Sequence, residues 1–89
     1  MKRFIVFILI ILLNGCLSFP EVKKEHYPSG ELKIEYNYKN NRLEGITKWY
    51  YESGEILYID TYKNGQKINR KAYDERGKLD FDQDYPYTE

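Results

Sequence analysis

The chain has few of the residue types that carry out covalent or metal chemistry. It contains one cysteine, Cys16, and one histidine, His26. A Ser-His or Cys-His centre needs a histidine as the base beside its nucleophile, and a zinc site needs three or four closely spaced His or Cys ligands. We therefore expect no enzyme activity, no catalytic residue, no metal site and no bound cofactor.

Three alternating aspartates near the end of the sequence, Asp80, Asp82 and Asp84, have the spacing that opens a calcium-binding loop. Such a loop needs glycine at the next position, which is held by Tyr85. We interpret residues 83–89 instead as an acidic, solvated tail.

Aromatic side chains form the main candidate binding surface. Trp49, Tyr50 and Tyr51 are consecutive, and in a strand Trp49 and Tyr51 lie on one side and Tyr50 on the other. Two interpretations stay open. The rings form the core of a small sheet, or they form a recognition surface for a protein, a glycan or lipid head groups, to which Tyr36 and Tyr58 also contribute.

The N-terminus has the features of an export signal. Lys2 and Arg3 precede an unbroken apolar run from Phe4 to Leu13, which has the length of a signal core and is too short to span a bilayer. Leu13-Asn14-Gly15-Cys16 resembles the lipobox of bacterial lipoproteins, with Asn14 where Ala, Ser, Thr or Val is usual. An ordinary secretory signal and a short uncleaved anchor are the alternatives.

The lipobox resemblance implies cleavage before Cys16, a thioether-linked diacylglycerol on its thiol and an acyl chain on the new amino group. Two or three acyl chains make a stable membrane anchor. We therefore expect a protein of the bacterial cell envelope, held on the inner or the outer membrane by its lipid.

Charge argues against nucleic acid as a partner. The chain has 14 basic and 14 acidic residues, and removal of Lys2 and Arg3 with the signal leaves a small acidic excess. The remaining lysines alternate with Glu and Asp, whereas a protein that tracks phosphates needs a clustered basic excess.

The body of the chain repeats itself. Tyr27-Pro28-Ser29-Gly30-Glu31 aligns with Tyr51-Glu52-Ser53-Gly54-Glu55, and at the same offset Tyr38-Lys39-Asn40 aligns with Tyr62-Lys63-Asn64. A weaker third copy begins at Arg76-Gly77. Internal periods of about 20 to 50 residues indicate arrays of one supersecondary unit.

Each unit has the pattern of a β-hairpin. Apolar residues occupy every second position from Leu32 to Tyr38, which puts Leu32, Ile34, Tyr36 and Tyr38 on one face of a strand. Asn40-Asn41 and Asn64-Gly65 are turn pairs. The pattern predicts strands at 31–39, 45–51, 55–63, 67–73 and 78–82. Short loops make sequence neighbours spatial neighbours, so we expect a mainly β fold, a single-layer antiparallel meander, with an apolar N-terminal helix where the signal is uncleaved.

These units resemble the MORN-repeat proteins in the variant form common in bacteria. That pattern is Tyr-x-x-Gly-x-Leu, then Tyr-x-Asn-Gly, then a glycine followed by an aromatic strand. The matching positions are Tyr27, Gly30, Leu32, Tyr38, Asn40, Asn41, Gly45, Trp49, Tyr50 and Tyr51, and again Tyr51, Gly54, Ile56, Tyr62, Asn64 and Gly65. The resemblance covers about residues 27 to 79 and implies an interaction role.

The expected organisation is a lipoprotein signal over residues 1–15, a tether over 16–26, hairpin repeats over 27–82 in units of 27–50, 51–73 and 74–82, and the tail over 83–89. The expected function is a small protein-interaction or scaffold module held at the membrane, with a protein partner of unknown identity and an unknown oligomeric state. Because bacterial variant-MORN proteins are often labelled antitoxin-like, the alternative is a protein that binds and neutralises a toxin. A third possibility, direct contact with anionic lipid through scattered lysines, is disfavoured by the net charge.

Overall fold

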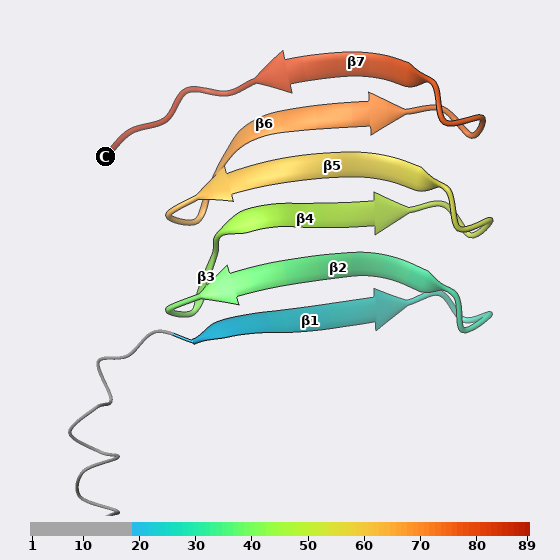
Figure 1. Ribbon diagram of the computed structural model, residues 1–89, viewed down its shortest axis with the longest axis horizontal. Coiled ribbons are helices and arrows are strands. Elements are labelled where there is room, and N and C mark those ends of the chain that lie inside the picture. The colour runs from blue at the N-terminus through green and yellow to red at the C-terminus, as the bar shows by residue number, and fades with distance from the viewer. Residues whose placement is uncertain (1–18) are drawn as a thin grey trace, which may run out of the picture.

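The computed structural model describes residues 19–89, so the expected signal peptide, its apolar helix and Cys16 lie outside the described residues. All regular elements from residue 19 onward are strands of one antiparallel sheet (Figure 1). They are β1 Pro20–His26, β2 Leu32–Lys39, β3 Arg42–Leu43, β4 Gly45–Tyr50, β5 Ile56–Lys63, β6 Gln66–Tyr73 and β7 Leu79–Asp84. The predicted mainly β, single-layer meander is confirmed. Within the same residues no helix is long and apolar enough to cross a membrane.

The order of strands in the sheet is β1-β2-β4-β5-β6-β7, and the two-residue β3 pairs with β2 beside this path. Along this path each strand therefore pairs with the next strand in the sequence, as short connections require. The five predicted strands match β2, β4, β5, β6 and β7 to within two residues at each end.

The tether predicted over residues 16–26 is wrong for residues 20–26, which form β1. This strand pairs with β2 in a register that sets Lys23 opposite Tyr36 and Glu25 opposite Ile34. All seven of its residues are exposed. Since the strand is ordered by main-chain pairing along one edge, its side chains need no apolar alternation.

The sheet consists of three hairpin units, β1–β2, β4–β5 and β6–β7, that share one turn geometry. In the first turn the amide of Tyr27 donates to the carbonyl of Glu31 at 2.8 Å and the amide of Gly30 donates to the carbonyl of Tyr27 at 2.8 Å. The turns that begin at Tyr51 and Asp74 repeat both hydrogen bonds. The glycine of the first turn has a φ of 98°, a conformation open mainly to glycine. The third repeat is therefore complete at the level of the backbone.

Turns at the other ends of the strands connect one hairpin unit to the next. Asn40 and Asn41 have φ values of 55° and 62°, and Asn64 and Gly65 have 51° and 81°. Two consecutive positive φ values are what a tight two-residue hairpin turn needs. The two predicted turn pairs are confirmed, and Asn41 adopts a left-handed conformation as Gly65 does.

The strand register assigns side chains to two faces. One face carries Tyr36, Tyr38, Trp49, Tyr58 and Tyr62, and we call this set the aromatic face. The register sets Ile34 opposite Trp49 and Trp49 opposite Tyr58, so these residues share that face. The other face carries Glu35, Lys48, Ile59, Lys71 and Asp82, which are joined in one row by the same pairings.

Very little of this sheet is fully buried. Ile34 and Ala72 are the buried hydrophobic residues of the described chain, and Thr47 and Asp60 are its buried polar residues. In a single layer the large rings lie flat over their neighbours and remain partly exposed. In β2 the predicted inward position Ile34 is buried, at 3% exposure, whereas the other residues from Leu32 to Tyr38 are half-buried on both faces.

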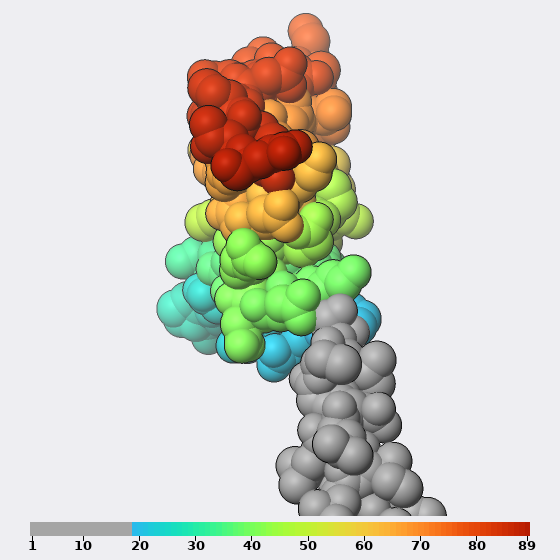
Figure 2. Space-filling view, turned by 90° about the vertical axis from the view of Figure 1, so that its left-hand side faces the viewer, coloured from blue at the N-terminus to red at the C-terminus, as the bar shows by residue number. Residues whose placement is uncertain are grey.

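The C-terminal residues are held against the sheet instead of being solvated as expected. The amide of Tyr85 donates to the carbonyl of Ile68, which extends the pairing of β7 with β6. The side-chain Nδ2 of Asn64 donates to the hydroxyl of Tyr87 at 2.7 Å, and Gln66 exchanges hydrogen bonds with Thr88. Figure 2 shows this red segment lying in front of the orange and yellow atoms that precede it.

Candidate functional site

A buried acid stands at the centre of the aromatic face. Asp60 on β5 is 0% exposed, and the register sets it between Thr47 of β4 and Arg70 of β6. In the repeat, Asp60 takes the position that Tyr36 holds in the preceding unit. A carboxylate in this position needs strong partners, because removal of an unpaired charge from water is costly.

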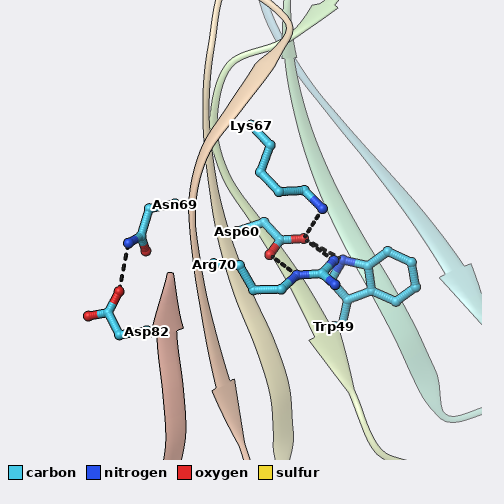
Figure 3. Close-up of polar contacts among 6 residues, drawn as sticks. All are labelled: Trp49, Asp60, Lys67, Asn69, Arg70 and Asp82. Carbon is cyan, nitrogen blue, oxygen red and sulfur yellow. Dashed lines mark hydrogen bonds and ion pairs between the residues drawn. The ribbon is translucent and has the colours of Figure 1, made fainter. Parts of the chain in front are cut away.

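Three side chains supply those partners (Figure 3). The guanidinium of Arg70 donates from Nε to Oδ1 at 2.7 Å and from Nη2 to Oδ2 at 2.8 Å. The indole Nε1 of Trp49 donates to Oδ2 at 3.1 Å, and Nζ of Lys67 lies 3.9 Å from the same oxygen. The paired geometry from Arg70 is the bidentate arrangement that a planar guanidinium makes with a carboxylate.

Arg70 also stacks on the aromatic face. Its guanidinium carbon lies 3.8 Å from the ring centroid of Tyr58 and 6.0 Å from that of Trp49. These two rings meet edge to face, with centroids 5.9 Å apart and planes at 82°. Arg70 is thus fixed by a carboxylate on one side and a ring on the other, an arrangement that lysine does not reproduce.

The pKa values of two groups reflect this cluster. Hydrogen bonding to Asp60 raises the pKa of the Arg70 guanidinium above its ordinary value. Burial raises the pKa of the Tyr62 hydroxyl, and the nearby charge of Asp60 adds to the effect. The cluster therefore keeps Arg70 charged and Tyr62 neutral over the physiological range.

A second part of the aromatic face lies over β1 and β2. The hydroxyl of Tyr36 donates to Oε2 of Glu25 at 2.9 Å, and the rings of Tyr36 and Tyr38 lie 6.0 Å apart. Nζ of Lys23 sits 5.1 Å from the centroid of Tyr38. Burial, followed by the hydrogen bond to Glu25, raises the pKa of Tyr36 to about 12. Rings and charged groups here form an open, polar surface.

The structure separates the residues that the sequence singled out. Trp49 and Tyr58 come together around Arg70, and Tyr36 lies farther along the same face. Tyr51 follows the end of β4 and begins a turn, where its hydroxyl donates to the carbonyl of Tyr73 at 2.8 Å. Tyr50 is the last residue of β4, and its carbonyl accepts a hydrogen bond from the hydroxyl of Tyr27 at 2.6 Å. Cys16 lies outside the described residues.

Tyr27 and Tyr51 hold equivalent places in consecutive repeats. Each donates its hydroxyl to the carbonyl of the residue that precedes the next turn, namely Tyr50 and Tyr73. Asp74 occupies this place in the third unit. Tyr27 and Tyr51 thus each link their own hairpin unit to the next one along the sheet. Their role is structural.

Sequence reasoning did not find Asp60, Arg70, Lys67 or Thr47. One signal was present: Asp60 interrupts the apolar positions Ile56, Tyr58 and Tyr62 on its strand. An acid in an inward series predicts a buried ionic partner on a neighbouring strand. Its partner, Arg70, is set opposite it only after the register of β5 and β6 shifts between Thr61 and Tyr62.

Two of the three aspartates considered for calcium accept hydrogen bonds from a side chain of the sheet. Asp82 and Asp84 each accept a hydrogen bond from Nδ2 of Asn69, at 2.7 and 2.8 Å. Figure 3 shows Asn69 and Asp82 on the side of the strands away from Arg70. Nζ of Lys71 lies 3.9 Å from Asp82. From residue 19 to residue 89 no three His, Cys, Asp or Glu side chains are grouped so that they could hold a metal ion.

Comparison with known families agrees with the hairpin repeat. The model of the MORN repeat variant matches residues 22–40 and 43–64, which span the β1–β2 hairpin and the segment from β3 to β5. No curated protein and no solved structure matches the chain. Over these two segments the chain carries the MORN repeat variant, as its repeat pattern predicted.

Proposed function

We propose that this protein is a membrane-anchored bacterial lipoprotein whose aromatic face binds another protein. The observation that carries the binding half is the placement of Tyr36, Tyr38 and Trp49 with Arg70 on one face of the sheet, where all four side chains remain partly exposed. Tyrosine, tryptophan and arginine are the residue types enriched at protein interfaces. MORN repeats are consistent with such an interaction module.

The rigidity of this face supports the same proposal. Arg70 and Trp49 are held by Asp60 through three hydrogen bonds, so these two side chains lose little conformational entropy when a partner packs on them. The rings are presented on strands and not on loops. A pre-organised surface of this kind favours a folded partner over a flexible one.

The anchoring half rests on the N-terminal sequence and on where β1 begins. Three residues, Leu17 to Phe19, separate Cys16 from Pro20, the first residue of β1. Three extended residues span roughly 10 Å. A lipidated Cys16 would therefore hold the sheet close to the membrane surface, in place of the longer reach that a tether over 16–26 implied.

The anchor is tested with Cys16→Ser and, separately, with globomycin. We expect the mature protein to carry the added mass of acyl chains and to partition with membranes, and both properties to be lost in the variant. Unchanged mass and unchanged partition in Cys16→Ser would contradict lipidation.

The binding face is tested by site-specific photo-cross-linking in intact cells. A cross-linking side chain at Tyr38 reports on the aromatic face, and the same group at Lys48, in the middle of β4 on the other face, is the matched control. We expect one discrete adduct from Tyr38 and none from Lys48, with loss of the adduct when Tyr36→Ala is added. Equal adducts from both faces, or none from Tyr38, would refute this use of the face, and a toxin in the adduct would favour the neutralising function instead.

A further inference from the structure

Because the hairpin repeats, each edge strand of the sheet, β1 or β7, has equivalent strands inside the sheet that are paired on both sides. β1, β4 and β6 each open a hairpin unit, and β2, β5 and β7 each close one. Closing strands pair with the next opening strand at the junctions β2–β4 and β5–β6. In the described chain β7 pairs only with β6, and β1 pairs only with β2.

We propose that β7 of one copy pairs with β1 of a second copy, head to tail, as a third junction of the same kind. The antiparallel direction is preserved, because every closing strand runs opposite to the opening strand that follows it (Figure 1). This self-association is separate from the partner bound on the aromatic face, since it uses the main chain of the two edges.

The repeat also fixes the register of this junction. The hairpin pairings Trp49 with Tyr58 and Ala72 with Phe81 make Phe81 equivalent to Tyr58, and the pairing of Glu25 with Ile34 makes Glu25 equivalent to Trp49. When the register of the internal junctions β2–β4 and β5–β6 is applied to β7 of one copy and β1 of the second, four residues of each strand face one another. The pairs are Phe81 with Glu25, Asp82 with Lys24, Gln83 with Lys23 and Asp84 with Val22.

Charge favours this pairing over the pairing of two β7 edges. β7 contains Asp80, Asp82 and Asp84 and no basic residue, whereas β1 contains Lys23 and Lys24 at its centre, between Glu21 and Glu25. Opposite charges directly across a strand pair stabilise it and like charges oppose it. The pair of Asp82 with Lys24 repeats the internal pair of Glu35 with Lys48, and two β7 edges brought together would set aspartates against one another.

Exposed apolar side chains lie on both edges. Leu79 and Phe81 on β7 are 48% and 45% exposed, and Val22 on β1 is 52% exposed. An open strand with apolar side chains is a template for pairing with another strand. A second copy would cover part of this surface on each edge.

Disulfide cross-linking tests the register. All variants use the full chain with Cys16→Ser, purified in detergent, so that the introduced cysteine is the only thiol. A mixture of the Lys24→Cys and Asp82→Cys variants is predicted to form a disulfide-linked dimer, since facing residues of antiparallel strands have a Cα separation within disulfide range. The matched control, Lys24→Cys mixed with Gln83→Cys, places the thiols on opposite faces and should form none.

Charge reversal supplies an independent readout. Asp82→Lys alone is expected to weaken self-association, measured by light scattering, by about tenfold. Adding Lys24→Asp to the same chain should restore it, with circular dichroism showing an unchanged sheet in each variant. Equal cross-linking in the two mixtures, no cross-linking in either, or failure of the double change to restore association would overturn the proposal.

Discussion

Asp60 and Arg70 face each other across β5 and β6, joined by two hydrogen bonds of 2.7 and 2.8 Å. The carboxylate is 0% exposed, while the Arg70 side chain is 19% exposed. This difference matters for stability, because a charge left without its partner costs more when it cannot reach water.

Removal of the Asp60 side chain and removal of the Arg70 side chain are therefore expected to lower the free energy of unfolding by different amounts. Asp60→Ala frees an Arg70 that can turn toward solvent, and we expect a loss of about 2 kcal/mol in the free energy of unfolding. Arg70→Ala leaves the buried carboxylate with Trp49 and Lys67 and also removes the stacking on Tyr58, so the expected loss is about 3 kcal/mol. Urea unfolding measures both, and a larger loss for Asp60→Ala would contradict the burial described here.

Thr47 offers a change in the stabilising direction. Its side chain is buried next to Asp60, and among the residues the structure describes its Oγ1 has no hydrogen-bond partner. Thr47→Val removes that polar atom at similar volume and adds a residue that strands favour, so we expect a gain of about 1 kcal/mol. The urea midpoint tests this, with Thr61→Val on the other face of β5 as the control. A marked destabilisation of Thr47→Val would show that the hydroxyl is satisfied.

Removal of the hydroxyl group from Tyr27 or Tyr51 is expected to lower the free energy of unfolding of the protein. Tyr51→Phe deletes the hydrogen bond to the carbonyl of Tyr73, which should cost about 1 kcal/mol. Tyr27→Phe should cost a similar amount, since it deletes the equivalent bond to Tyr50. Tyr50→Phe is the control, because the interaction of Tyr50 in this network is made by its carbonyl. Equal melting temperatures for all three variants and the wild type would rule out the links between hairpin units.

Stability should fall in alkaline solution. The pKa of Tyr36 is raised from 10.0 to about 12, mainly by burial and then by its hydrogen bond to Glu25. Above pH 10 the unfolded chain releases this proton while the folded chain keeps it, so the stabilisation present below 10 is lost as the pH rises toward 12. Tyr51 and Tyr62 have pKa shifts in the same direction, again mainly from burial.

Denaturation at successive alkaline pH values, followed by circular dichroism and tyrosinate absorbance, measures this decline. Tyr36→Phe should make the decline shallower, and Glu25→Gln should lower the pKa of Tyr36. A decline of the same steepness in wild type and Tyr36→Phe would contradict the assignment.

The sequence predicted the strands marked by apolar alternation or by a glycine turn before them, and it missed the exposed strand β1 and the two-residue β3. In β2, apolar residues at every second position specify both the strand and its buried side, as Ile34 shows. In β1 every residue is exposed, so the strand has no apolar alternation and the segment around Lys23 and Lys24 has the pattern of a solvated linker. The available signal was alignment of residues 20–26 with 44–50, where Lys24 falls on Lys48 and Val22 on Ile46.

The candidate site was only partly predictable for a related reason. Clustered aromatic residues are visible in the sequence, and Trp49 and Tyr58 do lie together. The pairing of Asp60 with Arg70 depends on a register shift between Thr61 and Tyr62 in the β5–β6 ladder. Such a shift changes which residues face each other and cannot be read from alternation.

The open sheet of three hairpin units begins at Pro20, within a few residues of Cys16 in the sequence. Backbone NMR of the full chain in detergent micelles, with amide exchange and cross-strand nuclear Overhauser effects, tests it directly. We expect contacts between Lys23 and Tyr36 and between Glu25 and Ile34, together with slow exchange of the β2 amides that face β1. Rapid exchange and no contact from residues 20–26 would show that this segment is a tether and that the sheet begins at β2.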